Sequence, residues 1–133
     1  NIKTALSLIK VPKCIASSGS MKKIQSNLEL TNLTPYFMNK IFSVEMVKNS
    51  NPSQDLFLLA ADSFGVEPKK CLVIEDSEVG VKAAKRANMN IFGFLGGRHC
   101  RFSDREKLLK AGADQIFDKM QNLPTMINML LKE

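Results

Sequence analysis

The sequence predicts an α/β protein, a Rossmann-like three-layer sandwich built on a mostly parallel sheet. Short apolar runs rich in β-branched residues alternate with longer segments of helical spacing along the 133 residues. The runs are apolar throughout, which is typical of strands covered on both faces. Strands that alternate with helices pair in parallel through right-handed crossovers, so we expect one layered domain with a single core.

The strands are expected where apolar runs are too short for helices and are bounded by turn residues. They cover residues 14–17, 41–44, 71–74 and 90–94, with a weaker one at 115–117. Helices are expected between them, because apolar residues recur at helical spacing. The stripes are Ala5, Leu6 and Ile9; Met21, Ile24 and Leu28; Leu56, Leu59, Ala60 and Phe64; Val79, Ala83 and Ala87; Leu108 and Leu109; Met126, Met129 and Leu130.

Helix boundaries are indicated by residues with special backbone preferences. Pro12 ends the opening helical segment, because its ring clashes with the preceding turn. Ser20 and Ser77 are expected N-caps. Gly65 and Asn88 are expected to end the helices that precede them, since both residue types adopt the left-handed conformation.

Composition and charge exclude several classes of protein. Apolar residues make up 44% and charged residues 24%, as in an ordinary globular domain. The net charge is +6, and residues 1–44 hold six lysines and one acid, so five of the six excess charges lie there. The lysines are scattered and not interleaved with aromatic residues, so we expect no nucleic-acid partner. They form a solvated face, or an acidic segment lies against them.

Membrane and cysteine patterns add two expectations. No stretch reaches the roughly 18 apolar residues of a membrane span, so no membrane partner is expected. Cys14 and Cys71 lie in apolar runs and are expected as small buried core residues, whereas Cys100 follows His99 in a loop. Three cysteines cannot all pair, and reduced thiols indicate a cytoplasmic protein.

Candidate ligand-binding residues follow the first and third strands, because ligands bind beyond the carboxyl ends of parallel strands. Ser17 and Ser18 lead directly into a helix, where hydroxyls and backbone N–H groups favour a phosphate; an ordinary cap and turn is the alternative. Glu75 and Asp76 close an apolar run and offer the oxygen ligands that Mg²⁺ prefers. The alternative is one cap residue beside one solvated acid.

Two further loops carry weaker candidates. Lys48 follows the second strand, where a cation could balance a phosphate, although an exposed lysine is the simpler interpretation. Arg98 and His99 follow a glycine pair after the fourth strand and could contact a substrate, although a plain turn explains them equally. His99 lacks any visible Ser/Asp or Cys/Asp arrangement, so no catalytic triad is expected.

These segments resemble the haloacid dehalogenase-like hydrolase superfamily, in the branch of β-phosphoglucomutase and the sugar-phosphate phosphatases. The resemblance covers nearly the whole chain. It rests on the ordered stretches Asp55-Leu56-Phe57-Leu58-Leu59-Ala60-Ala61, Gly65-Val66-Glu67-Pro68, Cys71-Leu72-Val73-Ile74-Glu75-Asp76-Ser77-Glu78-Val79-Gly80-Val81, Ala83-Ala84-Lys85-Arg86-Ala87-Asn88-Met89 and Gly93-Phe94-Leu95-Gly96-Gly97-Arg98-His99.

The resemblance implies roles for individual positions. Ser17 matches the motif that hydrogen-bonds the phosphoryl group, and Glu75 with Asp76 matches the motif that holds Mg²⁺. A lysine directly before a proline forms the remaining phosphate-binding motif. Here Asn51 takes that position, and Lys48, three residues earlier, is the candidate substitute.

The largest departure from the family is an absence. The family nucleophile is the first Asp of an Asp-x-Asp motif, and no Asp-x-Asp occurs in the 133 residues. The resemblance therefore implies that residues 1–12 are the end of the cap or the return helix and that residues 13–133 are the second half of the core domain. The family's first strand and most of its helical cap are lacking.

That strand lies, in the family, between the strand ending at Ser17 and the strand ending at Asp76. Without it the two halves must pair directly, leave a gap, or borrow a strand from another chain. Unpaired strand edges favour self-association.

The implied function is that of a Mg²⁺-dependent phosphatase or phosphomutase acting, in the intact parent, on a small phosphorylated metabolite such as a sugar phosphate. Without the nucleophile this chain alone is expected to be inactive. The alternative is a degenerate, non-catalytic domain that serves as a binding or dimerisation module.

Overall fold

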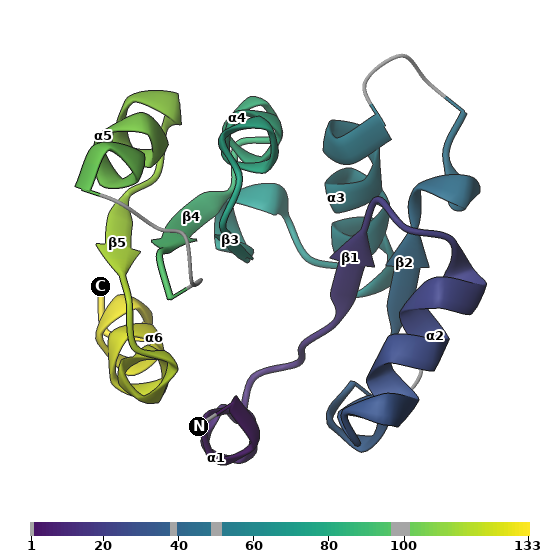
Figure 1. The fold of residues 1–133 in the computed structure, drawn as a ribbon. Helices are drawn as coiled ribbons and strands as arrows, with labels where there is room; N and C mark the ends of the chain where they lie inside the picture. Colours follow the sequence, from purple (N-terminus) through teal and green to yellow (C-terminus); the bar gives the residue numbers. More distant parts are fainter. Residues whose placement is uncertain (1, 38–39, 49–51, 97–101) are drawn as a thin grey trace.

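The computed structural model describes residues 2–37, 40–48, 52–96 and 102–133, and in them helices and strands alternate as the sequence predicts (Figure 1). The helices are α1 (Ile2–Leu8), α2 (Met21–Leu30), α3 (Pro52–Ser63), α4 (Glu78–Arg86), α5 (Phe102–Ala111) and α6 (Leu123–Leu131). The strands are β1 (Ile15–Ser17), β2 (Ile41–Ser43), β3 (Leu72–Glu75), β4 (Asn90–Phe94) and β5 (Gln115–Phe117). Short 3₁₀ turns are η1 (Thr34–Tyr36), η2 (Val44–Met46), η3 (Pro68–Lys70) and η4 (Met120–Asn122).

The strands of the described ranges form two parallel sheets, not one. β1 pairs with β2, with Ile15 opposite Ile41, and β3, β4 and β5 form a three-stranded sheet in that order. The prediction of parallel pairing is confirmed. Of the three arrangements left open for the two halves, direct pairing does not occur, because β1 and β3 each form the edge of a separate sheet.

Helices cover both faces of the strands, so the predicted three-layer architecture is confirmed. In the view of Figure 1, α3, α4 and α5 lie above the strands and α1, α2 and α6 lie below them. Side chains from both helical layers pack on β4. Ile91 belongs to a cluster with residues of α3, α4 and α5, and Phe92 belongs to one with residues of α6.

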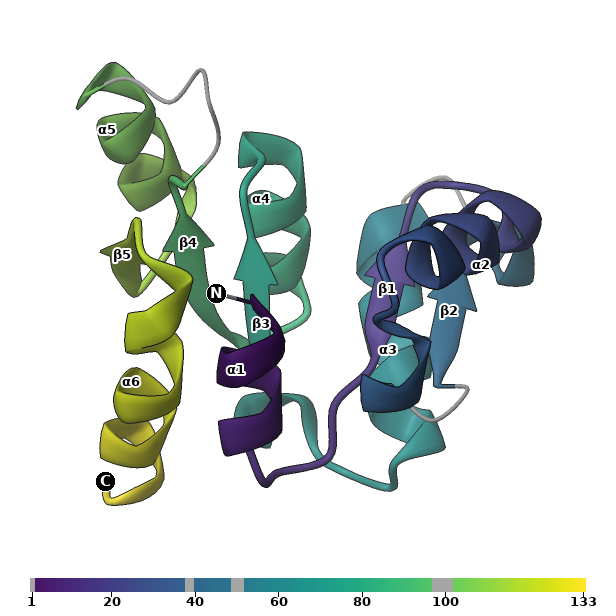
Figure 2. The same ribbon diagram turned by 60° about the horizontal axis from the view of Figure 1, so that its bottom comes forward.

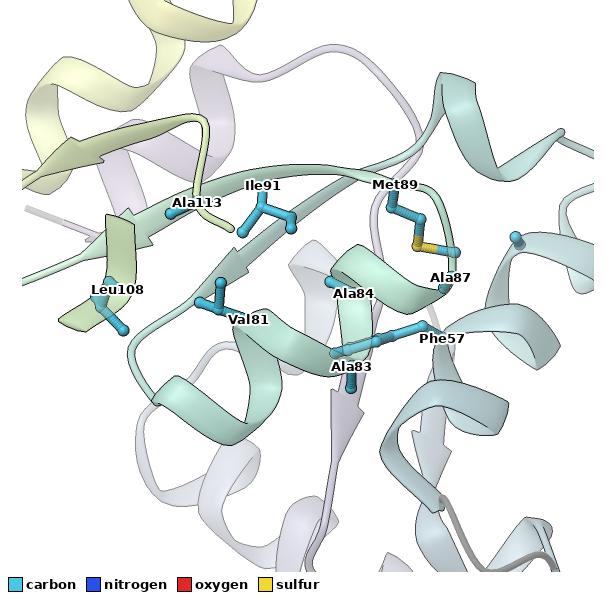
Figure 3. Packing of buried hydrophobic residues seen from close by; sticks show 10 residues of the cluster. Phe57, Val81, Ala83, Ala84, Ala87, Met89, Ile91, Leu108 and Ala113 are labelled. Carbon is cyan, nitrogen blue, oxygen red and sulfur yellow. The ribbon is translucent and has the colours of Figure 1, made fainter. Parts of the chain in front are cut away.

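The largest buried cluster joins the two halves of the chain through α3 and α4 (Figure 3). Phe57 and Ala61 of α3 pack with Val81, Ala83 and Ala84 of α4. Small side chains on α4 allow the two helices to approach closely. This contact holds the two-stranded sheet beside the three-stranded one.

Strand boundaries and caps agree closely with expectation. β4 and β5 have the predicted bounds, β1 and β2 are one residue shorter at one end, and β3 is shifted by one residue at both ends. The Ser20 and Ser77 side chains accept hydrogen bonds from the Lys23 and Gly80 backbone N–H groups, at 3.2 and 3.0 Å. Gly65 and Asn88 both adopt the left-handed conformation, with φ of 64° and 63°.

Three side chains placed on apolar stripes are exposed, so the stripe assignments are wrong there. Val79, Leu109 and Met129 are 72%, 43% and 66% exposed. The buried face of α4 is instead centred on Val81, Ala83 and Ala84, because that face lies against α3 and β4. Cys14 and Cys71 are half-buried and not fully buried as expected, since both lie beside the edges of the separate sheets.

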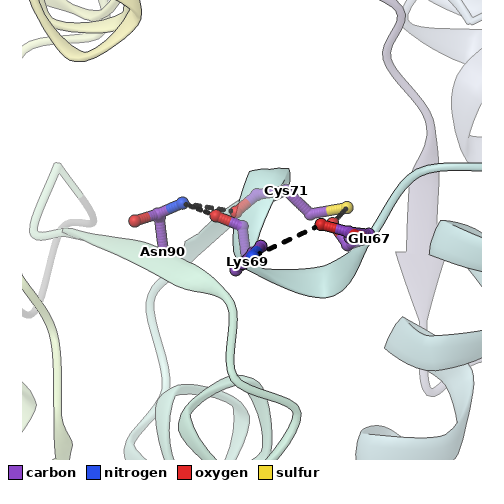
Figure 4. Close-up of polar contacts among 4 residues, drawn as sticks. All are labelled: Glu67, Lys69, Cys71 and Asn90. Carbon is purple, nitrogen blue, oxygen red and sulfur yellow. Dashed lines mark hydrogen bonds and ion pairs between the residues drawn. The ribbon is translucent and has the colours of Figure 1, made fainter. Parts of the chain in front are cut away.

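A small polar network fixes the start of β3 against β4 (Figure 4). The Asn90 side-chain amide donates to the carbonyls of Lys69 and Cys71, at 2.9 and 3.1 Å. The Asn90 backbone N–H also donates to the Cys71 carbonyl, at 3.0 Å. Because the side chain and the backbone of Asn90 both donate to the Cys71 carbonyl, these contacts set the register of β3 against β4.

None of the helices in the described ranges combines the length and the apolar composition that a transmembrane span requires.

Candidate functional site

The loop that follows β1 is organised by its own serines. Ser17 is half-buried, and its Oγ accepts a hydrogen bond from the Gly19 N–H at 3.1 Å. Within the described ranges no acceptor pairs with the Ser17 hydroxyl hydrogen, so the hydroxyl can donate to a ligand oxygen. Ser18 is exposed at the same strand end.

The end of β2 holds this loop in place. The Ser43 side chain is completely buried, and its Oγ donates to the Gly19 carbonyl at 2.6 Å and accepts from the Glu45 N–H at 3.2 Å. A polar residue buried at the end of an apolar strand is the signal that sequence reasoning could have used to find Ser43. It is a positioning residue for the Ser17 loop.

Glu45 modifies the anion site expected at the start of α2. Its Oε1 accepts a hydrogen bond from the Met21 N–H at 3.0 Å, and the Ser20 Oγ accepts from the Lys23 N–H. The expectation of free N–H groups here is therefore wrong for two of the first three residues of the helix. A phosphate bound at the start of α2 could accept a hydrogen bond from the Ser17 hydroxyl. It would also lie close to the Glu45 carboxylate, which accepts from the Met21 N–H.

The end of β3 presents two adjacent carboxyl groups of different environment. Glu75 is half-buried, and its Oε1 accepts hydrogen bonds from the Asp76 N–H, the Ser77 N–H and the Ser77 hydroxyl, at 3.0, 3.1 and 3.1 Å. Asp76 is exposed. The backbone turns at this point, as it must if both acids are to reach one cation.

Burial raises the pKa of the Glu75 carboxyl group above its ordinary value, and the Asp76 side chain raises this pKa further. Hydrogen bonds from the Ser77 and Asp76 backbone and the Ser77 hydroxyl oppose this effect and lower the pKa. A cation bound at the Glu75 carboxyl group would favour its charged form. The donor set therefore fits Mg²⁺, which binds through one or two carboxylates and keeps several waters.

Gly80, in the first turn of α4, completes this arrangement. A Cβ atom at Gly80 would overlap the carboxyl group of Glu75, so only glycine lets Glu75 lie against the helix here. From the sequence we expect Gly80 only to permit the turn at the end of the strand, and the contact with the Glu75 side chain is not foreseen. An isolated glycine within a helical stretch was the available signal.

The described residues hold no cluster of three or more His, Cys, Asp or Glu side chains arranged for a metal. Glu75 and Asp76 could thus supply two ligands to a metal ion, and further ligands would have to come from water or from outside the described residues. Lys48 is exposed after η2. Asn51, Arg98 and His99 lie outside the described residues.

The carboxyl ends of β1 and β3 lie at the same side of the molecule. Figure 2 shows the arrows of these two strands pointing the same way, toward the N-terminus of α4 in the case of β3. The chain therefore directs the Ser17 loop and the Glu75–Asp76 turn toward one edge of the strand layer.

The chain resembles known proteins along most of its length. The model of the haloacid dehalogenase-like hydrolase family matches residues 2–88. A phosphorylated carbohydrates phosphatase of Thermotoga maritima is 32% identical over 116 residues, which cover 84% of this chain and 51% of that protein. The 6-phosphogluconate phosphatase of Escherichia coli K12 is 31% identical over 94 residues, covering 71% of this chain and 42% of that protein.

Similarity also extends to a solved structure. A conserved haloacid dehalogenase-like protein of unknown function from Agrobacterium tumefaciens superposes with a TM-score of 0.92 at 36% identity, over 98% of this chain and 60% of that one. The chain thus spans about half the length of the two curated relatives. It belongs to the haloacid dehalogenase-like hydrolase family.

Proposed function

We propose that this chain supplies the metal-binding part and one phosphate-binding loop of a Mg²⁺-dependent phosphatase that acts on a small phosphorylated metabolite, such as a sugar phosphate. The observation that carries the proposal is the turn after β3, where a half-buried Glu75 and an exposed Asp76 lie side by side. Three hydrogen bonds to Glu75 Oε1 orient its carboxyl group. The names of the two curated relatives support the substrate class.

Each residue has a defined part in this proposal. Glu75 and Asp76 would hold Mg²⁺, which offsets the negative charge of a phosphoryl group when it is bound. The Ser17 hydroxyl would donate to a phosphoryl oxygen, and Ser18 and Lys48 would bind the same group at the strand ends. We also assign Asn51 to the phosphate-binding residues, and Arg98 and His99 to the residues that would contact the substrate.

Catalysis requires a nucleophile that these residues do not include. No Asp-x-Asp occurs in the sequence, so an attacking carboxylate would come from a polypeptide segment outside these 133 residues. We therefore expect the chain alone to bind Mg²⁺ and to show no turnover of para-nitrophenyl phosphate. We also keep the prediction of a cytoplasmic location, which rests on the unpaired cysteines.

Titration of the chain with Mg²⁺ by isothermal calorimetry tests the metal site. Glu75→Gln and Asp76→Asn should each lower the affinity at least tenfold. Glu78→Gln is the matched control, because Glu78 is an exposed acid in the same segment and makes only a 3.7 Å ion pair with Lys82. Equal affinities in all four proteins, or no Mg²⁺ binding by the unaltered chain, would contradict the proposal.

Binding of Mg²⁺ and inorganic phosphate by the same purified chain distinguishes part of an enzyme from a non-catalytic module. The absence of Asp-x-Asp and the presence of Asn51 before Pro52 favour a degenerate domain. Such a domain would bind neither Mg²⁺ nor inorganic phosphate. Phosphate hydrolysis by the chain alone, lost in Asp76→Ala, would instead show that the nucleophile lies within these residues.

A further inference from the structure

The carboxylate of Glu45 lies at the start of α2, although Glu45 itself belongs to η2. Its Oε1 accepts a hydrogen bond from the Met21 N–H at 3.0 Å, and 24 residues separate the two in sequence. The first turn of α2 contains no acid of its own. Glu45 therefore supplies, from another element, the negative charge that the amino end of this helix favours.

Pairing of β1 with β2 brings Glu45 beside the loop that carries Ser17. Ser17 lies opposite Ser43 in the parallel register, and Glu45 follows Ser43 by two residues. The Ser43 Oγ accepts from the Glu45 N–H at 3.2 Å and donates to the Gly19 carbonyl at 2.6 Å. Figure 1 shows the segment after β1 passing the end of β2 on its way to α2. Hydrogen bonds at its backbone and at its side chain therefore fix Glu45 next to the Ser17 hydroxyl's loop.

The charge of Glu45 is not neutralised by a basic side chain. Glu45 is exposed, and within the described ranges no lysine or arginine forms an ion pair with it. Lys22 and Lys23 lie in the first turn of α2 and are also exposed. The helix N–H groups and these two lysines attract an anion to the start of α2, and the negative charge of Glu45 opposes that attraction.

We propose that Glu45 is a specificity-determining residue, which weakens the binding of substrates that carry a second anionic group next to the phosphoryl group. When a phosphoryl group accepts from the Ser17 hydroxyl, a neighbouring carboxylate or phosphate of the same molecule lies within reach of the start of α2. There the Met21 N–H is already bonded to Glu45, and the Glu45 carboxylate repels the incoming charge. The preferred substrates are therefore phosphate monoesters whose organic part is uncharged close to the phosphate.

This inference rests on the proposed function, because it takes the Ser17 hydroxyl as a phosphate ligand. It adds a preference between substrates, which is set by a residue that binds neither the phosphoryl group nor Mg²⁺. Because the preference arises from the repulsion of two exposed charges, it should weaken at high salt, whereas a steric preference would not.

Two probes that differ by a single carboxylate, methyl phosphate and carboxymethyl phosphate, test the preference. Backbone amide NMR signals of the isotope-labelled chain, titrated with each probe in the presence of Mg²⁺, give the two dissociation constants. The unaltered chain should bind methyl phosphate more tightly. Glu45→Gln keeps an acceptor for the Met21 N–H and removes the charge. The ratio of the two dissociation constants should therefore shift toward carboxymethyl phosphate by about two- to fivefold, the usual effect of one charge at a helix end.

Glu29→Gln is the matched control, because it removes the same charge from the last turn of the same helix. Glu29 lies about 12 Å from Met21 along the helix axis, which exceeds the screening length of about 8 Å at physiological salt. The ratio in this variant should equal that in the unaltered chain. Raising the salt to about 1 M should bring the ratio in the unaltered chain toward that in Glu45→Gln. Glu45→Ala, which also removes the charge, repeats the comparison if circular dichroism shows that Glu45→Gln does not fold.

An unchanged ratio in Glu45→Gln, or an equal shift in Glu29→Gln, overturns the inference. A ratio in the unaltered chain that does not respond to salt also overturns it, since the preference would then not be electrostatic. In each of these cases methyl phosphate still binds, so the proposed phosphate-binding role of Ser17 stands. If methyl phosphate binds to none of the three proteins, that role is contradicted, and this inference fails with it.

Discussion

The carboxyl group of Glu75 lies against Gly80, in the space that a side chain at residue 80 would occupy. The contact joins the last residue of β3 to the first turn of α4 across a single turn. Ser77 completes it, because its Oγ donates to Glu75 and accepts from the Gly80 N–H. The orientation of Glu75 thus depends on a residue that carries no functional group.

Gly80→Ala should displace the Glu75 carboxyl group, and because the lost hydrogen bonds of Glu75 oppose the higher helix propensity of alanine, the free energy of unfolding should change little. Alanine is favoured over glycine within a helix by up to about 1 kcal/mol. If Glu75 holds Mg²⁺, displacement should weaken the affinity roughly ten- to a hundredfold, the usual effect of disturbing a ligand's supporting contacts. Calorimetry and urea unfolding measure the two effects. Lys82→Ala, at an exposed position of the same helix, is the control, and an unchanged Mg²⁺ affinity in Gly80→Ala would refute the dependence.

Ser43→Ala should lower the free energy of unfolding by about 1–3 kcal/mol, because the Gly19 carbonyl and the Glu45 N–H each lose a buried partner. Urea denaturation followed by circular dichroism measures the loss. The exposed Ser63, whose hydroxyl bonds only within its own helix, provides the control. Ser63→Ala should stay within about 0.5 kcal/mol of the unaltered chain. If both variants are equally stable, Ser43 does not hold the Ser17 loop.

Stability should fall at alkaline pH because of Cys14. Burial raises the pKa of its thiol to about 11, and the neighbouring Cys71 contributes to the rise. Between pH 9 and 11 the unfolded thiol ionises while the folded one stays neutral, so the unfolded state is favoured as pH rises. Below pH 9 the effect is absent. After allowance for partial exposure the loss should be at most about 2 kcal/mol.

Urea midpoints measured between pH 8 and 11 test this dependence. Cys14→Ala removes the titrating group and should flatten the curve, although Cys71, whose pKa burial also raises, leaves a smaller slope. A slope that is the same in Cys14→Ala and in the unaltered chain would exclude Cys14 as the source.

Gly65→Ala should destabilise the chain by about 1–2 kcal/mol through backbone conformation alone. Gly65 has a φ of 64° two residues after the end of α3, and no atom lies within 4 Å of a Cβ built there. The cost thus reflects only the left-handed conformation. Asn88→Gly, at a φ of 63°, should be close to neutral, since glycine adopts this conformation readily. Thermal unfolding compares the two, and a neutral Gly65→Ala would contradict the argument.

The sequence predicted the elements and layers well, because each depends on local pattern. Strand bounds follow from apolar runs, and Ser20, Ser77, Gly65 and Asn88 are set by local backbone preferences. Exposure of Val79 was not predictable in this way. The buried arc of α4 is decided by where α3 and β4 lie, which is a property of tertiary packing.

The candidate site could be predicted only as residue types at strand ends. Ser17, Glu75 and Asp76 stand out because polar residues close apolar runs. Glu45 was not foreseen, because its bond to the Met21 N–H crosses 24 residues of sequence. The sequence also could not decide whether the two halves of the strand layer pair directly, leave a gap or borrow a strand, because that depends on how α3 packs against α4.

The backbone N–H and C=O groups of Ile91 are both hydrogen-bonded to Asp114. The Ile91 N–H donates to the Asp114 carboxylate and the Asp114 N–H donates to the Ile91 carbonyl, both at 2.8 Å. β4 is also flanked by strands on both sides. Amide protons at the centre of β4 should therefore exchange with deuterated water far more slowly than those of β1, which has one neighbour. The chain would come apart in stages, with its amino-terminal half opening while the region around Ile91 keeps its structure.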